Sequence, residues 1–204
     1  MFEYSKKIDD WSQDMIKGLT EIWGNKISKA PDDVAPFTIK YLVTYLDGYM
    51  KEYGQKIIDR FDVLMGKLLG QNNVSYYVNT TPVSLHNSSE FFVSIGECHS
   101  FISYPTVVIH EICHIYFYYF IRSQNFLSFN KVSDISELLT ESQENELKEI
   151  ITVILNLEFS DLINQDDQGY PDHQVIRREL QALWLEKPDF ISWVSAAIKM
   201  YKRG

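Results

Sequence analysis

His110-Glu111-Ile112-Cys113-His114 is the stretch that decides how this chain is interpreted, because it follows the pattern H-E-x-x-H. It lies within a largely apolar segment that runs from Ser103 to Arg122. Pro105 suits the first turn of a helix, where its missing N–H costs no hydrogen bond, and Ser103 can cap that turn. About seventeen residues is long for a strand and ordinary for a helix, so the segment is predicted to be helical.

A helix places His110 and His114 one turn apart on the same face, where two imidazoles can hold one Zn²⁺ at about 2.0–2.1 Å. A strand would separate them by about 13 Å. Glu111 is displaced by one residue, so its carboxylate can reach a metal-bound water rather than the metal. The helix is apolar nearly all round and should be buried, where these groups are costly without a metal or a partner. The sequence therefore predicts a zinc site, with two neutral core histidines as the alternative.

Composition limits the class of protein and its partners. The chain has 204 residues, of which 45% are hydrophobic, enough for one domain over residues 1–204 with a sizeable core. A net charge of −9 argues against a nucleic-acid partner. The motif segment has three ionisable groups near its centre and is shorter than about 20 residues, which argues against a membrane span. Two cysteines make no disulfide framework, and the first residues lack the apolar core of a signal peptide, so we expect a cytoplasmic protein.

The apolar periodicity divides the chain into three parts. Residues 1–70 are predicted to form N-terminal helices, one over residues 11–23 and a longer one with tyrosines at every fourth position, which Gly48 or Gly54 could break. Residues 71–122 hold two predicted strands, 74–78 and 91–95, a possible short strand at 83–85, and the motif helix. Residues 123–204 hold the remaining helices. The expected fold class is α+β: a mostly helical domain with a small sheet before the motif helix.

A catalytic zinc takes three protein ligands and leaves one position for water. The extended three-histidine pattern is excluded, because Phe117 and Phe120 occupy the positions that would need glycine and histidine. A glutamate from a later helix is the other common solution. The candidates are Glu137, Glu141, Glu144, Glu146 and Glu149.

Glu149 is favoured as the third ligand. Thr152 and Asn156 continue its face of an otherwise apolar helix predicted over residues 142–157, and such a polar line could hold a metal ligand in place. Glu146 stays open as the second choice. The alternative for both is an ordinary solvated helix face.

The motif followed by a glutamate on a later helix resembles the gluzincin class of zinc metallopeptidases, the class of thermolysin. The resemblance covers the five motif residues and one distant glutamate. It implies a zincin-like fold with zinc held by His110, His114 and that glutamate, and with Glu111 as general base and proton shuttle. In such enzymes the strand nearest the motif helix lines the cleft, which here would be the strand ending at Gly96.

The chain departs from the gluzincin pattern in two respects, and it offers further candidates for residues at the active site. Asn145-Glu146 is similar to the start of the thermolysin-type ligand helix, but the residues after it differ, and the interval from His114 to Glu149 is longer than in that class. A peptidase needs a donor for the oxyanion, for which His173 beside Asp172 is the first choice, although Asp172 could simply cap a helix. Tyr118 lies on the metal face of the helix and could serve as this donor instead, although core packing is the simpler explanation. His86 and His99 lie on the side of the predicted sheet, where His99 could approach the metal but is more simply explained as a histidine of a surface loop. Cys113 is expected to pack as a small hydrophobic residue.

The sequence thus predicts a zinc-dependent metallopeptidase, a hydrolase that cleaves a peptide or protein substrate. One alternative is a non-catalytic zincin-like domain that regulates or binds a protein. Another is a helical interaction protein in which the motif occurs by chance.

Overall fold

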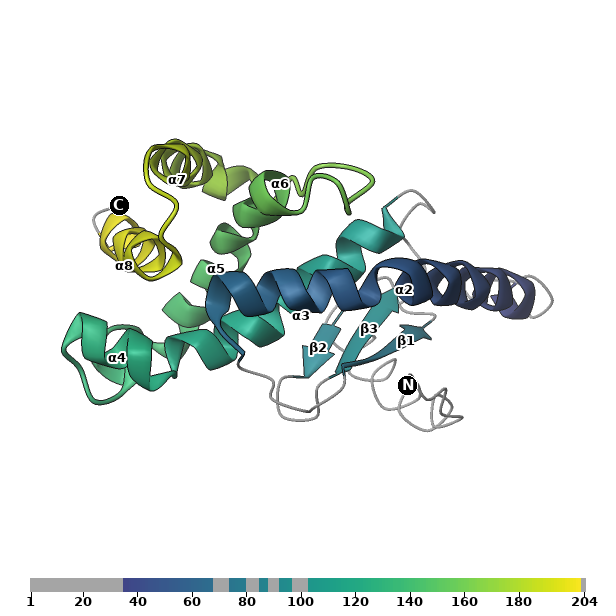
Figure 1. Ribbon diagram of the computed structural model, residues 1–204, viewed down its shortest axis with the longest axis horizontal. Coiled ribbons are helices and arrows are strands. Elements are labelled where there is room, and N and C mark those ends of the chain that lie inside the picture. Colours follow the sequence, from purple (N-terminus) through teal and green to yellow (C-terminus); the bar gives the residue numbers. More distant parts are fainter. Residues whose placement is uncertain (1–34, 68–73, 80–84, 88–91, 97–102, 203–204) are drawn as a thin grey trace, which may run out of the picture.

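The computed structural model describes residues 35–67, 74–79, 85–87, 92–96 and 103–202 (Figure 1). The helix expected over residues 11–23 lies outside the described residues, as do Cys98 and His99.

The motif segment forms α3 (Tyr104–Ile121), which lies at the centre of the fold and is buried along most of its length. Pro105 occupies the first turn, as predicted. Ser103 makes no side-chain cap; instead its carbonyl oxygen accepts a hydrogen bond from the amide of Val107 at 2.9 Å. An almost entirely apolar helix must be covered on every side, and α3 contacts α2, the sheet and α5.

The helix α2 (Ala35–Met65) runs unbroken through Gly48 and Gly54 and packs against α3 (Figure 1). Its buried side includes Phe61, whose ring stacks on Tyr116 of α3 at 4.8 Å between centroids. The hydroxyl of Tyr116 donates to Asp62 at 2.7 Å. These contacts join the two longest of the described helices through both apolar and polar groups.

Three short strands lie beside α3. They are β1 (Ser75–Asn79), β2 (Leu85–Asn87) and β3 (Phe92–Gly96), in the order β1-β3-β2. The outer strands pair with β3 in parallel (β1) and antiparallel (β2) fashion, and the second pairing sets His86 opposite Val93. The central strand, β3, was expected to line the site. The hydrogen bond between the sheet and the motif is made instead by β2, at an edge of the described sheet, where His86 reaches Glu111.

The expected α+β class is wrong. Helix accounts for 76% of the interpretable chain, whereas the strands are five, three and five residues long. The core is built by helices around α3, and the strands contribute Val93 and little else to it among the described residues. The protein is therefore all-α in architecture. The β-branched and aromatic residues that suggested a larger role for the sheet belong to strands that place only Val93 in the core among the described residues.

The C-terminal part is a series of short helices. They are α4 (Gln124–Asn130), η1 (Ile135–Glu137), α5 (Glu141–Ile150), η2 (Ile151–Val153), α6 (Ile154–Glu158), η3 (Pro171–His173), α7 (Gln174–Glu186) and α8 (Phe190–Tyr201). Trp184, Phe190 and Trp193 pack α7 against α8, and Trp193 donates to the carbonyl oxygen of Leu180 at 2.7 Å. Among the described helices, none is long and apolar enough to cross a membrane.

The helix predicted over residues 142–157 is interrupted by the tighter turn η2. The carbonyl oxygen of Glu149 accepts a hydrogen bond from Arg177 at 3.0 Å and lies 2.8 Å from Thr152 Oγ1. A continuing α-helix would use that oxygen for the amide four residues on, so these side chains compete with it. Asp172 lies inside η3 rather than capping α7, which begins at Gln174.

Candidate metal centre

The structure brings His110, His114 and Glu149 together. Nε2 of His110 lies 3.3 Å from Oε2 of Glu149, and Nε2 of His114 lies 3.3 Å from Oε1. Three ligands at about 2.0–2.1 Å from a tetrahedral ion are roughly 3.3 Å apart. Each imidazole is therefore as far from the carboxylate as two zinc ligands are from each other, and one ligand atom from each of the three residues lies within 4.8 Å of the other two.

Helix geometry and packing explain this arrangement. The two histidines are one turn apart on α3, and their ring centroids are 4.4 Å apart. Glu149 lies in the last turn of α5, which packs on α3. His114 is buried, whereas His110 and Glu149 keep about a fifth of their side-chain surface exposed (20% and 18%), so a ligand can reach the trio from outside.

The charges of the trio are strongly coupled. Burial lowers the pKa of His110, but hydrogen bonds to Asp167 and Glu149 outweigh it and raise that pKa to about 10. Burial and the neighbouring His110 lower the pKa of His114 to about 4. Burial would raise the pKa of Glu149, yet its hydrogen bonds to both histidines bring it far below the ordinary value. Without a metal the trio thus holds a proton on His110, which a bound cation must displace.

Asp167 binds the ring nitrogen of His110 that does not face Glu149, a role that was not predicted from the sequence. Nδ1–H of His110 donates to Oδ2 of Asp167 at 2.5 Å, which directs Nε2 toward Glu149. A metal-binding histidine commonly donates its other N–H to a carboxylate in this way, which fixes the tautomer and the ring. His114 has no hydrogen-bond partner at Nδ1 among the described residues, so packing in the core sets its orientation.

Asp167 is held in turn by a buried network. Its Oδ1 accepts hydrogen bonds from Arg177 at 2.7 Å and from the Thr152 hydroxyl at 2.9 Å. Asn156 donates to its carbonyl oxygen at 2.9 Å and accepts from its amide at 2.7 Å. Thr152 and Asn156 were predicted to support the side chain of Glu149; instead they fix the loop that carries Asp167. Two polar side chains on a buried helix face, followed by an aspartate-rich loop, were the signal in the sequence for this partner.

The loop that carries Asp167 and Gly169 passes close over Arg177. Gly169 has φ +59°, and a Cβ added there would lie 2.7 Å from Cζ of Arg177. A side chain at this position would be strained in its backbone and would collide with the guanidinium. The close approach allows Arg177 to reach both the carbonyl oxygen and the carboxylate of Asp167.

Glu111 lies beside the trio and is hydrogen-bonded to a residue outside it. Its Oε2 is 3.0 Å from Nδ1 of His86 on β2. Burial would raise the pKa of Glu111, but the hydrogen bond from His86 and the nearby His114 lower it, so the carboxylate is ionised. His86, Glu111 and His114 form a second group whose ligand atoms lie within 4.8 Å of one another. The two groups share His114.

No protein-family model, curated protein or solved structure matches this chain. The likeness to gluzincins consequently remains one of sequence motif.

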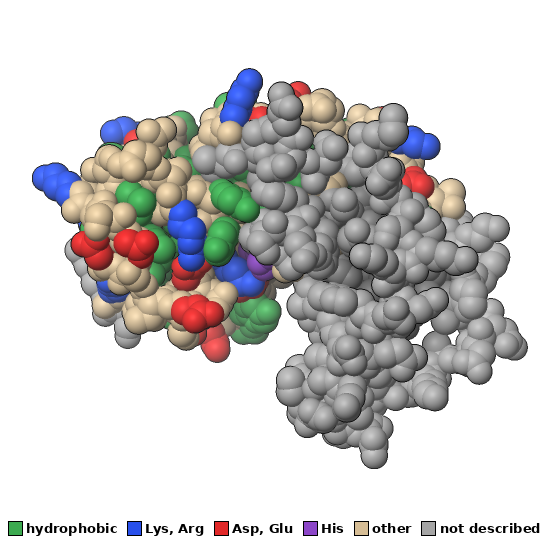
Figure 2. All heavy atoms as spheres, turned by 90° about the horizontal axis from the view of Figure 1, so that it is seen from below, with side chains coloured by type: hydrophobic (Ala, Val, Ile, Leu, Met, Phe, Trp, Pro, Cys, Tyr) green, Lys and Arg blue, Asp and Glu red, His purple; other side chains and the backbone are tan. Residues whose placement is uncertain are grey.

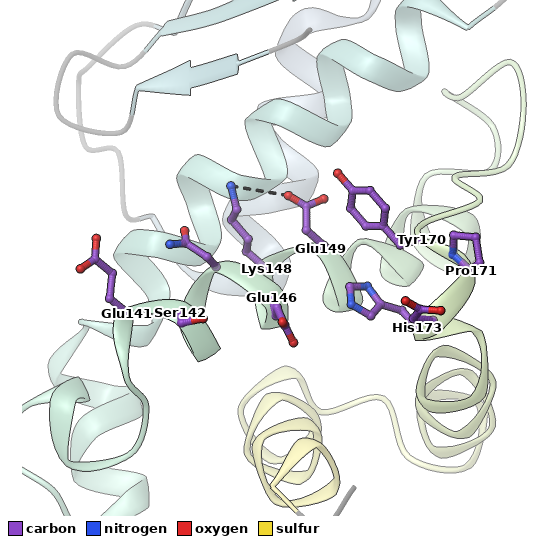
Figure 3. Close-up of a pocket in the computed structure, with 10 residues that line it drawn as sticks. Glu141, Ser142, Glu146, Lys148, Glu149, Tyr170, Pro171 and His173 are labelled. Carbon is purple, nitrogen blue, oxygen red and sulfur yellow. Dashed lines mark ion pairs between the residues drawn. The ribbon is translucent and has the colours of Figure 1, made fainter. Parts of the chain in front are cut away.

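A cavity of about 800 Å³ opens beside Glu149 and contains His173. Figure 3 shows the side chains of Lys148 and Tyr170 directed toward the Glu149 carboxylate, with Lys148 Nζ 3.5 Å from Oε1. His173 lies further from that carboxylate and contacts the Tyr170 ring at 5.6 Å between centroids. The charge of Glu149 and partial burial raise the pKa of Tyr170. Tyr170 and Lys148 are therefore better placed than His173 to act at the trio.

A second cavity of about 670 Å³ opens beside His114 and His86. It shares Glu141, Asn145 and Lys148 with the first cavity, so one face of α5 forms a wall of both. Tyr118 lines this second cavity but packs its ring on Arg122, 3.8 Å from Cζ, rather than on the trio. Figure 2 shows a histidine at the surface where acidic, basic and hydrophobic side chains are interspersed.

The remaining residues singled out in the sequence lie apart from the trio. Glu146 is exposed and accepts a hydrogen bond from the Tyr201 hydroxyl. Cys113 is buried in the core, as expected of a small hydrophobic residue.

Proposed function

We propose that the protein is a zinc-dependent metallopeptidase in which His110, His114 and Glu149 hold the ion and Glu111 is the general base. The observation that carries this proposal is the 3.3 Å spacing from the Glu149 oxygens to both imidazole Nε2 atoms. Two imidazoles and one carboxylate form a donor set that suits zinc and leaves a fourth position for water. Asp167 supports this set by keeping the proton of His110 on Nδ1.

A bound zinc polarises a carbonyl oxygen and lowers the pKa of its water to about 7. Glu111, ionised and adjacent to His110, would accept a proton from a water at the metal and return it to the leaving amine. Lys148 and Tyr170, which face Glu149, supply positive charge and a hydroxyl donor for the oxyanion. The substrate is a peptide or protein segment that occupies the two cavities, which lie on either side of the α5 face that carries Lys148. We place the protein in the cytoplasm, in keeping with its two cysteines.

Metal analysis combined with a cleavage assay tests the proposal. Protein purified without added metal should contain about one zinc per chain, lose it to a chelator, and cleave a mixed peptide library monitored by mass spectrometry. His114→Ala should lose both zinc and cleavage. Full zinc occupancy in His114→Ala would exclude this site.

One observation favours a second candidate function. The hydrogen bond to His86 occupies one oxygen of the Glu111 carboxylate, and a zincin-like domain that binds a protein partner without hydrolysis would need no proton acceptor at the other. Zinc bound at full occupancy with no cleavage of the library would favour this candidate over the peptidase.

The choice of third ligand gives a direct comparison of two variants. Glu149→Gln should weaken zinc binding strongly, because the amide loses the charge that faces both imidazoles. Glu146→Gln is the matched control on the same helix and should leave zinc affinity unchanged, since Glu146 is exposed and bonded to Tyr201. Competition with a chromogenic chelator measures both affinities. The reverse order would mean that the other turn of α5 supplies the ligand.

Asp167→Asn tests the support of His110. An amide accepts the Nδ1–H bond less strongly than a carboxylate and can turn its NH₂ toward the ring, so zinc affinity should fall by about 10- to 100-fold. The adjacent Asp166→Asn is the control, because Asp166 is exposed. Equal zinc affinities in the two variants would remove Asp167 from the site.

A further inference from the structure

We propose that His86 is a positioning residue, which holds the Glu111 carboxylate in the orientation that proton transfer requires; this inference rests on the proposed function. His86 lies in β2, before the motif helix, and Glu111 in α3. Nδ1 of His86 and Oε2 of Glu111 are 3.0 Å apart. The two side chains are mostly buried, with 18% and 9% of their surfaces exposed.

A buried general base needs a fixed orientation as well as a charge. Among the described residues, His86 is the hydrogen-bond partner that the structure gives Glu111. A carboxylate has two oxygens, so binding Oε2 to His86 leaves Oε1 to accept the proton of a water. Without this bond the Glu111 side chain could rotate about its own torsions, and displacement of a reacting group by about 1 Å can cost roughly 10²-fold in rate.

His86 is itself held from two sides. Its backbone pairs with that of Val93 in the sheet, and Val93 is completely buried. Its ring lies 4.9 Å from that of His114 between centroids. The short strand β2 thus has a definite role: it carries the imidazole that reaches the carboxylate next to the metal ligands.

The same three groups could instead hold a metal, since His86, Glu111 and His114 have ligand atoms within 4.8 Å of one another. An ion bound there would take up Glu111 as a ligand and remove the base. Asp167 and its network support the other trio, in which His86 takes no part. A positioning role therefore predicts that zinc binding survives the loss of His86, whereas a ligand role predicts that it does not.

The test compares His86→Leu with His86→Asn in zinc-loaded protein. Leucine fills similar space without a donor, whereas the asparagine amide lies near the position of Nδ1 and restores one. His86→Leu should lower kcat by about 10- to 100-fold with little change in KM or zinc content, and His86→Asn should recover most of the loss. In a Glu111→Gln background, His86→Leu should have no further effect, because the group that it positions is already gone.

Two results in that comparison would overturn the inference. Loss of zinc from His86→Leu would make His86 a ligand, and an unchanged kcat in that variant would make the contact irrelevant to turnover.

An NMR measurement separates this inference from the proposed function. In ¹⁵N-labelled, zinc-loaded protein at neutral pH, Nδ1 of His86 should carry the proton and Nε2 should not, and Glu111→Ala should change this pattern. An unprotonated Nδ1 in the wild type would overturn the hydrogen bond itself. A protonated Nδ1 in a protein that cleaves no peptide would overturn the proposed function, and with it the role of His86 in turnover, while the contact stands.

Discussion

Glu111→Gln is expected to keep its zinc and lose most of its turnover. Glu111 is not a member of the ligand trio, so the metal content should equal that of the wild type. The amide cannot accept a proton, and general-base catalysis is typically worth about 10²–10⁴-fold. The glutamine carbonyl can still accept the hydrogen bond from His86, so the melting temperature should change little. Cleavage of a peptide library by the variant and the wild type, at equal zinc occupancy, measures the effect.

The Glu179→Gln protein controls for removing a charge from an exposed site outside both cavities and should cleave like the wild type. Equal cleavage by Glu111→Gln and the wild type would exclude Glu111 from the mechanism. A variant that loses its zinc would show instead that Glu111 is a ligand, in the group that it forms with His86 and His114.

Arg177→Met should have the largest effect on stability. Arg177 is only 3% exposed, and its guanidinium donates to Oδ1 and the carbonyl oxygen of Asp167, to Thr152 and to the carbonyl oxygen of Glu149. Removing one partner of a buried ion pair typically costs about 3–5 kcal/mol of unfolding free energy. Chemical denaturation followed by circular dichroism gives the difference.

The neighbouring residue supplies a matched control. Arg178 is exposed, so Arg178→Met removes the same charge from the same helix and should change the unfolding free energy little. The double variant Arg177→Met with Asp167→Asn should recover part of the loss, because it also removes the uncompensated charge. Equal stability of the two arginine variants would contradict the role of the buried network.

Local rules were sufficient for the motif helix and pointed to a glutamate that the structure brings close to both histidines. Pro105 marks the start of α3, the spacing of His110 and His114 sets them on one face, and the polar residues that follow Glu149 in η2 and α6 singled it out. These inferences depend on helix periodicity, which a sequence shows directly. The coupling of the three residues into one trio additionally needs α5 to pack on α3, which periodicity alone could not establish.

The partners of the trio could not be found in this way. Asp167 comes from a loop, Arg177 from α7 and His86 from an edge strand, and their sequence intervals follow no period. Tertiary packing alone brings them to the site. The prediction of the fold class was wrong for the same reason. The strand patterns are visible in the sequence, but how little the strands contribute to the core is decided by tertiary packing.

Arg177 has a practical consequence for anyone who wishes to shorten this protein. A fragment that ends at Gln168 would contain both histidines, Glu149 and Asp167, and on paper would be a complete binding unit. It would lack Arg177, the buried cation on α7 that donates to the carboxylate and the carbonyl oxygen of Asp167. Arg177 reaches Glu149 only through that residue's carbonyl oxygen and supplies no ligand atom, yet the binding unit depends on it, so α7 belongs to the shortest fragment that should bind metal.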